Sequence, residues 1–256
     1  MPKLDLSRIE RAERLRSYFE LQLTFAEAMA RREGRALVEA VGLYTNLMRR
    51  FGLAHLDETT RATEWSRFCE PLGSLGSAVA RSNWARDFYL AMPEEPAPPG
   101  QPVFGCFRLE LRDADTVVRL HFNNADSADD IGPLAGSKIE ARRDELRAMF
   151  AFVRGTHRTA RTVLGGSWLY NLEAYRRLFP EVYGQSRHPP EGHVRLNGTS
   201  SWGQFVNHRE FVKDDLRRIL LERLETLDLE APWRAFPFPA LNVQAPVETF
   251  YEFYGS

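Results

Sequence analysis

A glycine-rich junction in the second half of the chain carries residue types from which catalytic sites are built. Gly165, Gly166 and Ser167 follow an apolar segment and precede a helical pattern, so the serine is expected at a strand-to-helix turn. Such a turn is the layout of a nucleophile elbow, where a neighbouring amide stabilises an oxyanion. The elbow pattern needs a glycine where Leu169 stands, and the alternative is a serine that caps the following helix. A hydrolase would also need a base and a residue that orients it, and four residues could supply them: His193, His208, Asp214 and Asp215.

Two tryptophans, Trp168 and Trp202, occur in similar surroundings, each directly after a serine and close to a glycine. If the segments that carry them are neighbouring strands, the two indole rings would wall an aromatic pocket for a small molecule. The polar groups of this pocket would come from residues that follow the tryptophans: Tyr170, Asn171, Gln204 and Asn207. The alternative is that both rings belong to the core and that the amide side chains hold neighbouring backbone in place.

A third polar group begins on a predicted strand, where Arg119 and His121 share one face. Histidine titrates near neutral pH, so His121 could accept a proton from a substrate that Arg119 helps to bind. The loop that follows is rich in asparagine and aspartate, and its carboxylates, Asp126 among them, could hold a substrate amine or a divalent cation. The loop lacks the spacing of an EF-hand, so we predict no metal site. A structural histidine and a solvated turn are the alternatives.

The placement of these residues depends on a change of hydrophobic period near residue 100. Residues 1–92 have apolar residues at helical spacing and predict a helical N-terminal region of four helices. Residues 93–102 include five prolines and predict an extended linker. Residues 103–256 predict an α+β domain in which helices pack on a mostly antiparallel sheet. Its strands are expected at 103–112, at 116–122, at 161–164 with an extension as far as 170 left open, in two pieces within 193–206, and at 240–245. Its helices are expected at 139–153, 172–179 and 214–227.

Residues 116–179 resemble part of a known enzyme family. They are expected to form a strand, a glycine-containing loop, a helix, a strand that leads to Asn171, and a short helix with Ala174. This order resembles the acyl-CoA half of the GNAT acyltransferases. The loop lacks the family's Arg/Gln-x-x-Gly-x-Gly/Ala pattern, and Leu178 stands where the family has a tyrosine.

The resemblance implies an acyl-CoA-dependent N-acyltransferase, with coenzyme A or acyl-CoA bound by the loop before the central helix. In that family the loop amides bind the cofactor pyrophosphate, for which a helix N-terminus has the right geometry and dipole. The matching residues here are Gly136, Ser137 and Lys138, with Asn171 after the next strand. A backbone group beside Trp168 would position the thioester. The proton of the acceptor amine would pass to one of three groups: His121, Glu110 or an acidic residue of the loop.

The overall composition limits the class of protein. The formal net charge is -1 with acids and bases interspersed, so no basic face is predicted for nucleic acid. The sequence has no signal-like N-terminal segment and no run of about 20 apolar residues, which predicts a cytoplasmic protein that does not bind membranes. Arginine greatly outnumbers lysine, as is typical of GC-rich bacterial genomes. The two cysteines, Cys69 and Cys106, are expected to be buried free thiols.

The sequence therefore predicts an enzyme that acts on a small molecule, with acyl transfer as its most concrete form. Two other classes stay open. One is a non-catalytic module in which aromatic residues hold a ligand and the N-terminal helices form a homodimer. The other is a serine hydrolase that uses Ser167.

Overall fold

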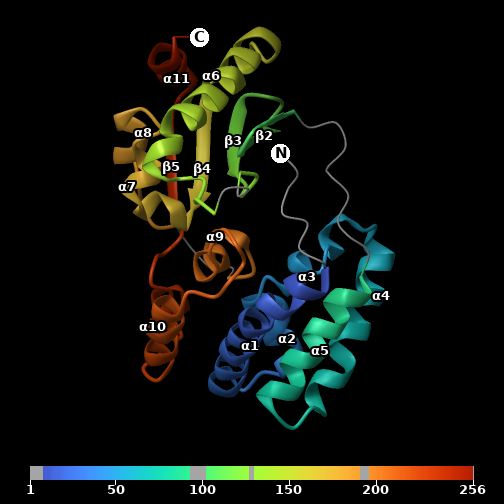
Figure 1. The fold of residues 1–256 in the computed structure, drawn as a ribbon. Helices are drawn as coiled ribbons and strands as arrows, with labels where there is room; N and C mark the ends of the chain where they lie inside the picture. The colour runs from blue at the N-terminus through green and yellow to red at the C-terminus, as the bar shows by residue number, and fades with distance from the viewer. Residues whose placement is uncertain (1–7, 93–101, 127–129, 191–195, 256) are drawn as a thin grey trace. The chain divides into compact units, whose positions relative to one another are not determined.

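The computed structural model describes residues 8–92, 102–126, 130–190 and 196–255 (Figure 1). These residues form two compact units. The helical unit contains the described residues from 8 to 92 and from 196 to 237, and the sheet unit contains those from 102 to 190 and from 238 to 255. The predicted α+β class, with helices packed on a mostly antiparallel sheet, is confirmed. The predicted linker falls outside the described residues except for Pro102.

The first segment of the helical unit consists of α-helices joined by short turns. Its elements are α1 (Arg8–Glu33), α2 (Leu37–Tyr44), α3 (Leu47–Arg50), η1 (Leu53–His55), α4 (Glu58–Cys69), η2 (Glu70–Gly73) and α5 (Ala78–Ala91). α1 ends where Gly34 adopts a left-handed φ of 64°, a conformation that glycine reaches without steric penalty. α4 begins at Asp57, whose side chain accepts a hydrogen bond from the amide of Thr60.

The second predicted helix, residues 37–52, is interrupted after Tyr44. The amide of Asn46 donates to the Oε1 atom of Gln22 on α1 at 2.7 Å instead of continuing the helical ladder. The side-chain amide of Asn46 also donates to the hydroxyl of Tyr18 at 3.0 Å. All three side chains are buried, so contacts with the neighbouring helix outweigh the local helical preference.

Residues 196–237 complete the helical unit, whereas the sequence prediction placed them with the sheet. Their elements are α9 (Thr199–Trp202), η5 (Gly203–Phe205), α10 (Asp214–Leu224) and η6 (Pro232–Ala235). Residues 196–206 form no strand, contrary to the two strand pieces predicted within 193–206, because the chain is helical from Thr199 to Phe205; residues 193–195 lie outside the described residues. The indole of Trp202 anchors this segment: it has no exposed surface, and its Nε1 donates to the carbonyls of Tyr44 at 2.9 Å and Leu196 at 2.7 Å.

The sheet unit is built on five strands in the spatial order β1-β2-β3-β4-β5: β1 (Val103–Phe104), β2 (Phe107–Arg112), β3 (Val117–Phe122), β4 (Thr162–Ser167) and β5 (Leu241–Pro246). Neighbouring strands are antiparallel except β3 and β4, which are parallel and are connected through α6 (Ile139–Thr156). The single strand predicted over 103–112 is a hairpin, because Gly105 turns the chain with a φ of 59°. The amide of Cys106 in this turn donates to the Glu145 carboxylate of α6 at 3.0 Å.

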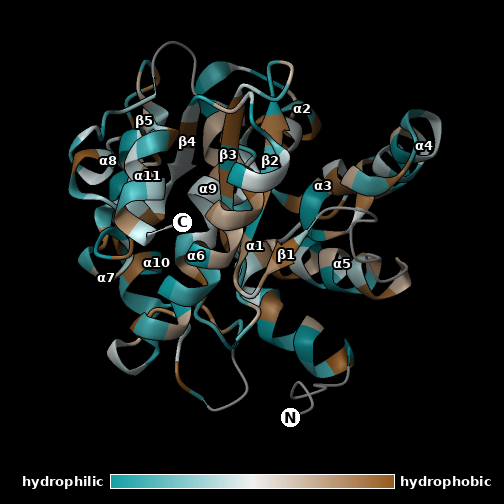
Figure 2. Cartoon of the chain, turned by 90° about the horizontal axis from the view of Figure 1, so that it is seen from above, coloured by the Kyte–Doolittle hydropathy of each residue, from teal (hydrophilic) through white to brown (hydrophobic). Residues whose placement is uncertain are grey.

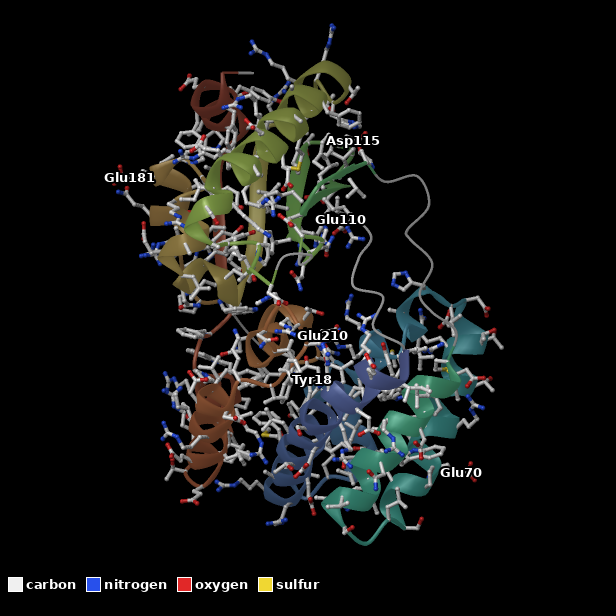
Figure 3. All side chains as sticks on the ribbon, in the orientation of Figure 1. Tyr18, Glu70, Glu110, Asp115, Glu181 and Glu210 are labelled. Atoms are coloured by element: carbon white, nitrogen blue, oxygen red, sulfur yellow. The ribbon has the colours of Figure 1, made fainter. Side chains whose placement is uncertain are left out.

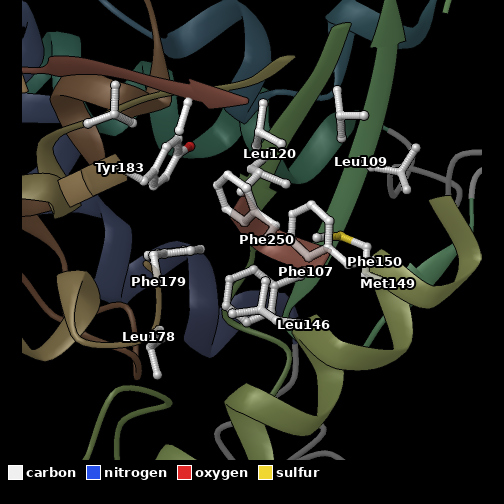
Figure 4. Packing of buried hydrophobic residues seen from close by; sticks show 14 of the residues in the cluster. Phe107, Leu109, Leu120, Leu146, Met149, Phe150, Leu178, Phe179, Tyr183 and Phe250 are labelled. Carbon is white, nitrogen blue, oxygen red and sulfur yellow. The ribbon is translucent and has the colours of Figure 1, made fainter. Parts of the chain in front are cut away.

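One face of the sheet is apolar and is covered by helices. Its side chains pack with residues from α6, α7 (Glu173–Arg176), α8 (Glu181–Gln185), α11 (Val247–Tyr254) and the connections between them (Figure 4). Val163, Phe150 and Phe250 have no exposed surface in this cluster, and each such side chain contributes about 2 kcal/mol to folding. Much of the surface of α6 and α8 is hydrophilic (Figure 2), as expected for helices with one buried side.

At Gly165, near the end of β4, the backbone lies close to two buried tyrosine side chains. Gly165 lies on the covered face, where a Cβ atom would overlap the Tyr170 hydroxyl and meet the Tyr183 hydroxyl at 2.5 Å. The two hydroxyls are hydrogen-bonded at 2.9 Å, and both tyrosines are buried. Burial raises the pKa of Tyr170 and of Tyr183 well above the usual value. Tyr170 therefore belongs to the core, and the predicted role in a substrate pocket does not fit its position.

Candidate functional site

The second face of the sheet carries polar side chains, as the alternation within the predicted strands indicates. Arg119 and His121 of β3 lie on this face and are half-buried. The antiparallel register sets Arg108 of β2 directly beside His121 and sets Glu110 beside Arg119. Glu110 is labelled on β2 in Figure 3. The structure thus brings together three of the predicted site residues, Arg119, His121 and Glu110, on adjoining strands.

His121 and Glu110 form a hydrogen-bonded pair on this face. The Nε2 atom of His121 lies 2.9 Å from Oε2 of Glu110, and the Nε atom of Arg112 donates to Oε1 of the same carboxylate at 2.8 Å. Burial opposes ionisation of Glu110, but the hydrogen bonds from His121 and Arg112 outweigh it and hold the pKa of this carboxyl below its usual value.

The electrostatic surroundings keep the His121 imidazole neutral. Burial lowers its pKa, the hydrogen bond to Glu110 opposes this change, and the positive charges of Arg108 and Arg119 lower the pKa further. The net pKa lies below the ordinary value of 6.5, so the ring is uncharged at pH 7. With the Nε2 proton directed at the ionised Glu110, the Nδ1 atom is the nitrogen that can accept a proton.

Arg108 adds positive charge beside this pair. It is half-buried, and its Nε atom is shielded from solvent and has no hydrogen-bond partner among the described residues. Along β2 and β3, three guanidinium groups, those of Arg108, Arg112 and Arg119, therefore share this face with the carboxylate of Glu110. The excess of positive charge favours an anionic ligand.

The parallel pairing between β3 and β4 stops halfway along the two strands. Three residue pairs are formed, the last between Arg119 and Leu164, and each strand then continues for three residues without pairing to the other. We call these ends, residues 120–122 of β3 and 165–167 of β4, the strand fork. Backbone groups that point into the fork have no ladder partner on the facing strand.

Gly166 leaves space on the polar face beside the strand fork. It lies directly opposite Asn242 of β5. A Cβ atom on Gly166 would lie 3.2 Å from Oδ1 of Asn242 and 3.9 Å from a terminal guanidinium nitrogen of Arg119. Because Gly166 has no side chain, Asn242 and Arg119 can lie close to the backbone of β4 at this position.

The segment before α6 presents exposed backbone amides. Gly136–Lys138 forms a 3-10 turn, η3, which leads directly into the 18 residues of α6. Gly136 and Ser137 are exposed, and a Cβ atom on Gly136 would meet no other atom within 4 Å. Arg177 donates to the carbonyl of Leu134, two residues before this turn, at 3.4 Å. Exposed amides at the start of a helix, with a guanidinium group nearby, suit a phosphate group.

Lys138 and Asp126 are part of an internal ion-pair network instead of a binding surface. The Nζ atom of Lys138 donates to Oδ1 of Asp126 at 3.0 Å and to the carbonyl of Ile131 at 3.1 Å, and only 9% of the residue is exposed. Arg142 of α6 lies 3.1 Å from the other carboxylate oxygen of Asp126. The predicted roles of Lys138 in holding the cofactor and of Asp126 in holding the substrate are not supported by this arrangement.

Three predicted residues organise the turn after β4. The hydroxyl of Ser167 accepts the amide of Leu169 at 3.2 Å and thereby caps η4 (Trp168–Asn171). The side-chain amide of Asn171 donates to the carbonyls of Trp168 at 2.7 Å and Pro239 at 2.8 Å. Trp168 stacks on Phe238 with the ring centroids 6.1 Å apart. Ser167 and Asn171 thus stabilise the turn that places Trp168 after the strand fork.

The remaining predicted residues that the structure describes belong to the helical unit. Trp202 and Gln204 belong to the helical unit and have no exposed surface. The two tryptophans of the predicted pocket therefore belong to different units. The side-chain amide of Gln204 donates to the carbonyl of Ser201 at 2.7 Å. Of the partners suggested for a Ser167 hydrolase, His208, Asp214 and Asp215 belong to the helical unit and not to the unit of Ser167, while His193 lies outside the described residues.

Two residues of the polar face, Arg108 and Asn242, were missed by the sequence reasoning. The alternation of β2 places Arg108 on the same face as Glu110, so the signal for Arg108 was present in the sequence. Asn242 reaches the site only through the pairing of β5 with β4, strands separated by more than 70 residues of chain. No local pattern carries that information.

The described residues contain no group of three or more histidine, cysteine, aspartate or glutamate side chains that could hold a metal ion. No helix in the described ranges combines the length and the apolar character needed to cross a membrane. Comparisons of the chain with protein-family models, with curated proteins and with solved structures find no match.

Proposed function

We propose that the sheet unit is an acyl-CoA-dependent N-acyltransferase. The observation that carries the proposal is the strand fork: two parallel strands, connected through a helix, separate over their last three residues. The fork includes the end of β3, and the exposed residues Gly136 and Ser137 directly precede α6, the helix that connects β3 to β4. This arrangement agrees with the resemblance between residues 116–179 and the acyl-CoA half of the GNAT acyltransferases.

The residues of this chain fit the proposed ligand in two places. The amides of Gly136 and Ser137, with the neighbouring guanidinium group of Arg177, suit the pyrophosphate. The unpaired backbone groups of the strand fork suit the amide-rich arm of coenzyme A, because strand backbone pairs with extended amides. When bound, acyl-CoA supplies an activated thioester carbonyl.

His121 is the group that accepts the proton of the acceptor amine. Its Nδ1 atom takes the proton as the amine nitrogen bonds to the thioester carbon and the carbon–sulfur bond breaks, and the sulfur leaves as a thiolate that is then protonated. Glu110 is a positioning residue, because its ionised carboxylate fixes the tautomer of His121 through Nε2.

A backbone substitution tests the phosphate site. We expect Gly136→Pro to weaken the binding of coenzyme A by about tenfold or more, because proline removes one amide and a hydrogen bond to a charged group contributes about 1.5–3 kcal/mol. The fold should persist, because Ala135 already has the extended backbone that precedes proline, with φ -61° and ψ 152°, and proline is tolerated in a first helical turn. Isothermal titration calorimetry with coenzyme A measures the change.

Gly136→Ala is the matched control, because it keeps the amide and adds a methyl group in open space. Equal affinity of the proline and alanine variants would show that this amide holds no phosphate. A wild-type protein whose melting temperature does not respond to millimolar coenzyme A or acetyl-CoA would overturn the proposed function itself.

The proton acceptor is tested by the rate and its pH dependence. We expect His121→Gln to lower kcat about a hundredfold, with unchanged affinity for coenzyme A, as measured by thiol release from acetyl-CoA in the presence of primary amines. Since the neutral imidazole is the active form, wild-type kcat/KM, expressed per neutral amine, should fall as the pH drops through a pKa below 6.5. Glu110→Gln should move this acid limb to still lower pH, because it removes the negative charge that favours the imidazolium. An acid limb that stays in place in Glu110→Gln would contradict the assignment.

A further inference from the structure

Arg108 is the feature of the polar face that the proposed reaction leaves unexplained. Its charge is half-buried, its Nε atom has no hydrogen-bond partner, and no carboxylate pairs with it among the described residues. Buried polar nitrogens in proteins nearly always have a partner, so an unpaired one points to a group that binds there. Arg142 also has a buried Nε atom without a partner, but its terminal nitrogens pair with the carboxylates of Asp126 and Glu145, whereas no nitrogen of Arg108 has such a partner among the described residues.

Arg108 lies next to His121, the proton acceptor of the proposed reaction. It stands directly opposite His121 in the antiparallel register, and side chains in such pairs have Cβ atoms about 5 Å apart. Arg119 approaches from the other side, with a terminal nitrogen 3.9 Å from the Cβ position of Gly166. The positive charges of both arginines act on the imidazole that accepts a proton in the proposed reaction, because both lower the pKa of His121.

We propose that Arg108, together with Arg119, binds the carboxylate of an amino acid, and that the acceptor of the acyl group is its α-amino group. A guanidinium group binds a carboxylate through two parallel hydrogen bonds, which fixes the orientation of the ligand as well as its position. In an α-amino acid the amine is one carbon away from the carboxylate, so a carboxylate on Arg108 places the amine beside His121. This inference rests on the proposed function, because it names the acceptor class of the same site.

The chemical step balances with these groups. The neutral α-amino nitrogen forms a bond to the thioester carbon, the carbon–sulfur bond breaks, and the amine proton moves to Nδ1 of His121. The thiolate then takes up a proton to give the free thiol. The products are an N-acylated amino acid and coenzyme A, and the carboxylate stays on the arginines throughout.

Matched pairs of acceptors test the inference through thiol release from acetyl-CoA. The pairs are alanine with ethylamine, phenylalanine with phenethylamine, and lysine with cadaverine, each amine lacking only the carboxylate. We expect at least one amino acid to react with a kcat/KM about tenfold or more above that of its amine, and Arg108→Gln to abolish this preference while the affinity for coenzyme A is unchanged. Arg158→Gln, which removes the same charge from an exposed turn at the start of β4, should keep the preference.

Binding without acyl-CoA separates the two proposals. Calorimetric titration of the free protein with the same amino acids and amines, and with inorganic phosphate, should show saturable binding of an amino acid that weakens at least tenfold in Arg108→Gln. Such binding in a protein that binds no coenzyme A would reject acyl transfer and keep the carboxylate site. Coenzyme A binding with equal use of amines and amino acids, or with a preference that survives Arg108→Gln, would reject the carboxylate site and keep acyl transfer. Binding of phosphate alone would also reject it.

Discussion

Replacing Arg142 by methionine is expected to lower the free energy of unfolding of the sheet unit by about 4 kcal/mol at neutral pH. The guanidinium group of Arg142 is buried and lies 2.6 Å from Oε1 of Glu145, 3.1 Å from Oδ2 of Asp126 and 2.9 Å from the sulfur of Cys106. The loss is large because methionine fills the space but leaves the partly buried carboxylate of Glu145 without its cation, and a carboxylate shielded from water is unstable when unpaired. Urea denaturation followed by circular dichroism measures the change in midpoint.

The pH dependence of this loss identifies its cause. Burial raises the pKa of Glu145 above its usual value even with Arg142 present, and removal of Arg142 raises it further. A carboxyl whose pKa is higher in the folded than in the unfolded state stabilises the fold below its unfolded pKa, near 4.5, and loses that contribution as the pH rises through the folded pKa. The difference between wild type and Arg142→Met should therefore narrow as the pH is lowered from 8 to 5.

Arg147→Met is the matched control on the same helix. The Arg147 side chain is about half exposed and pairs with the exposed carboxylate of Asp144. Exposed pairs of this kind contribute at most about 1 kcal/mol, so the control should lose little stability. A loss in Arg142→Met that is the same at every pH would assign its effect to packing and not to the uncompensated carboxylate of Glu145.

Replacing Gly165 by alanine is expected to lower the free energy of unfolding by about 3 kcal/mol. The added methyl group would overlap the hydroxyl of Tyr170 and come within 2.5 Å of that of Tyr183. Neither ring can move aside easily, because both tyrosines are buried and their hydroxyls are hydrogen-bonded to each other. Thermal and urea denaturation of the purified variant measure the loss.

The adjoining glycine provides the control for this prediction. In Gly166→Ala the methyl group points to the opposite, polar face and meets Oδ1 of Asn242 at 3.2 Å, a contact that a small shift of the asparagine relieves. Its loss of stability should stay below about 1 kcal/mol. Equal losses in the two variants would mean that the tyrosine pair does not determine the need for glycine at position 165.

Sequence reasoning was accurate where a local pattern decides the structure. The alternation in β3 correctly assigned Arg119 and His121 to one face, and the glycine at position 34 correctly marked the end of α1. It failed where a distant contact decides. The strand expected over 103–112 turns at Gly105 because Glu145, 40 residues further on, receives the amide of the next residue.

The same distinction applies to the candidate site. Glu110 and His121 were identified separately, from the resemblance and from the strand pattern, and only the register shows that they are hydrogen-bonded. Lys138 was expected at a phosphate because of its place in the loop, but Asp126 and the Ile131 carbonyl hold its amine. Trp168 and Trp202 look alike in sequence, yet they belong to different units, because hydrogen bonds to Tyr44 and Leu196 bury Trp202 among helices.

The alternation of the chain between the two units has a consequence for protein synthesis. When the ribosome has made the first five helices, their core still lacks Trp202 and Phe236, whose rings pack against Phe25 of α1. When it has made β4, the sheet still lacks β5, which pairs along the whole of that strand. The helical unit can therefore complete its core only after residues near 236 have been made, and the sheet unit only after β5 and α11 have been made, so exposed apolar surface must persist until late in synthesis. A nascent chain of this design depends on late, nearly simultaneous folding of both units, and slow translation through the first helices would not help it to fold.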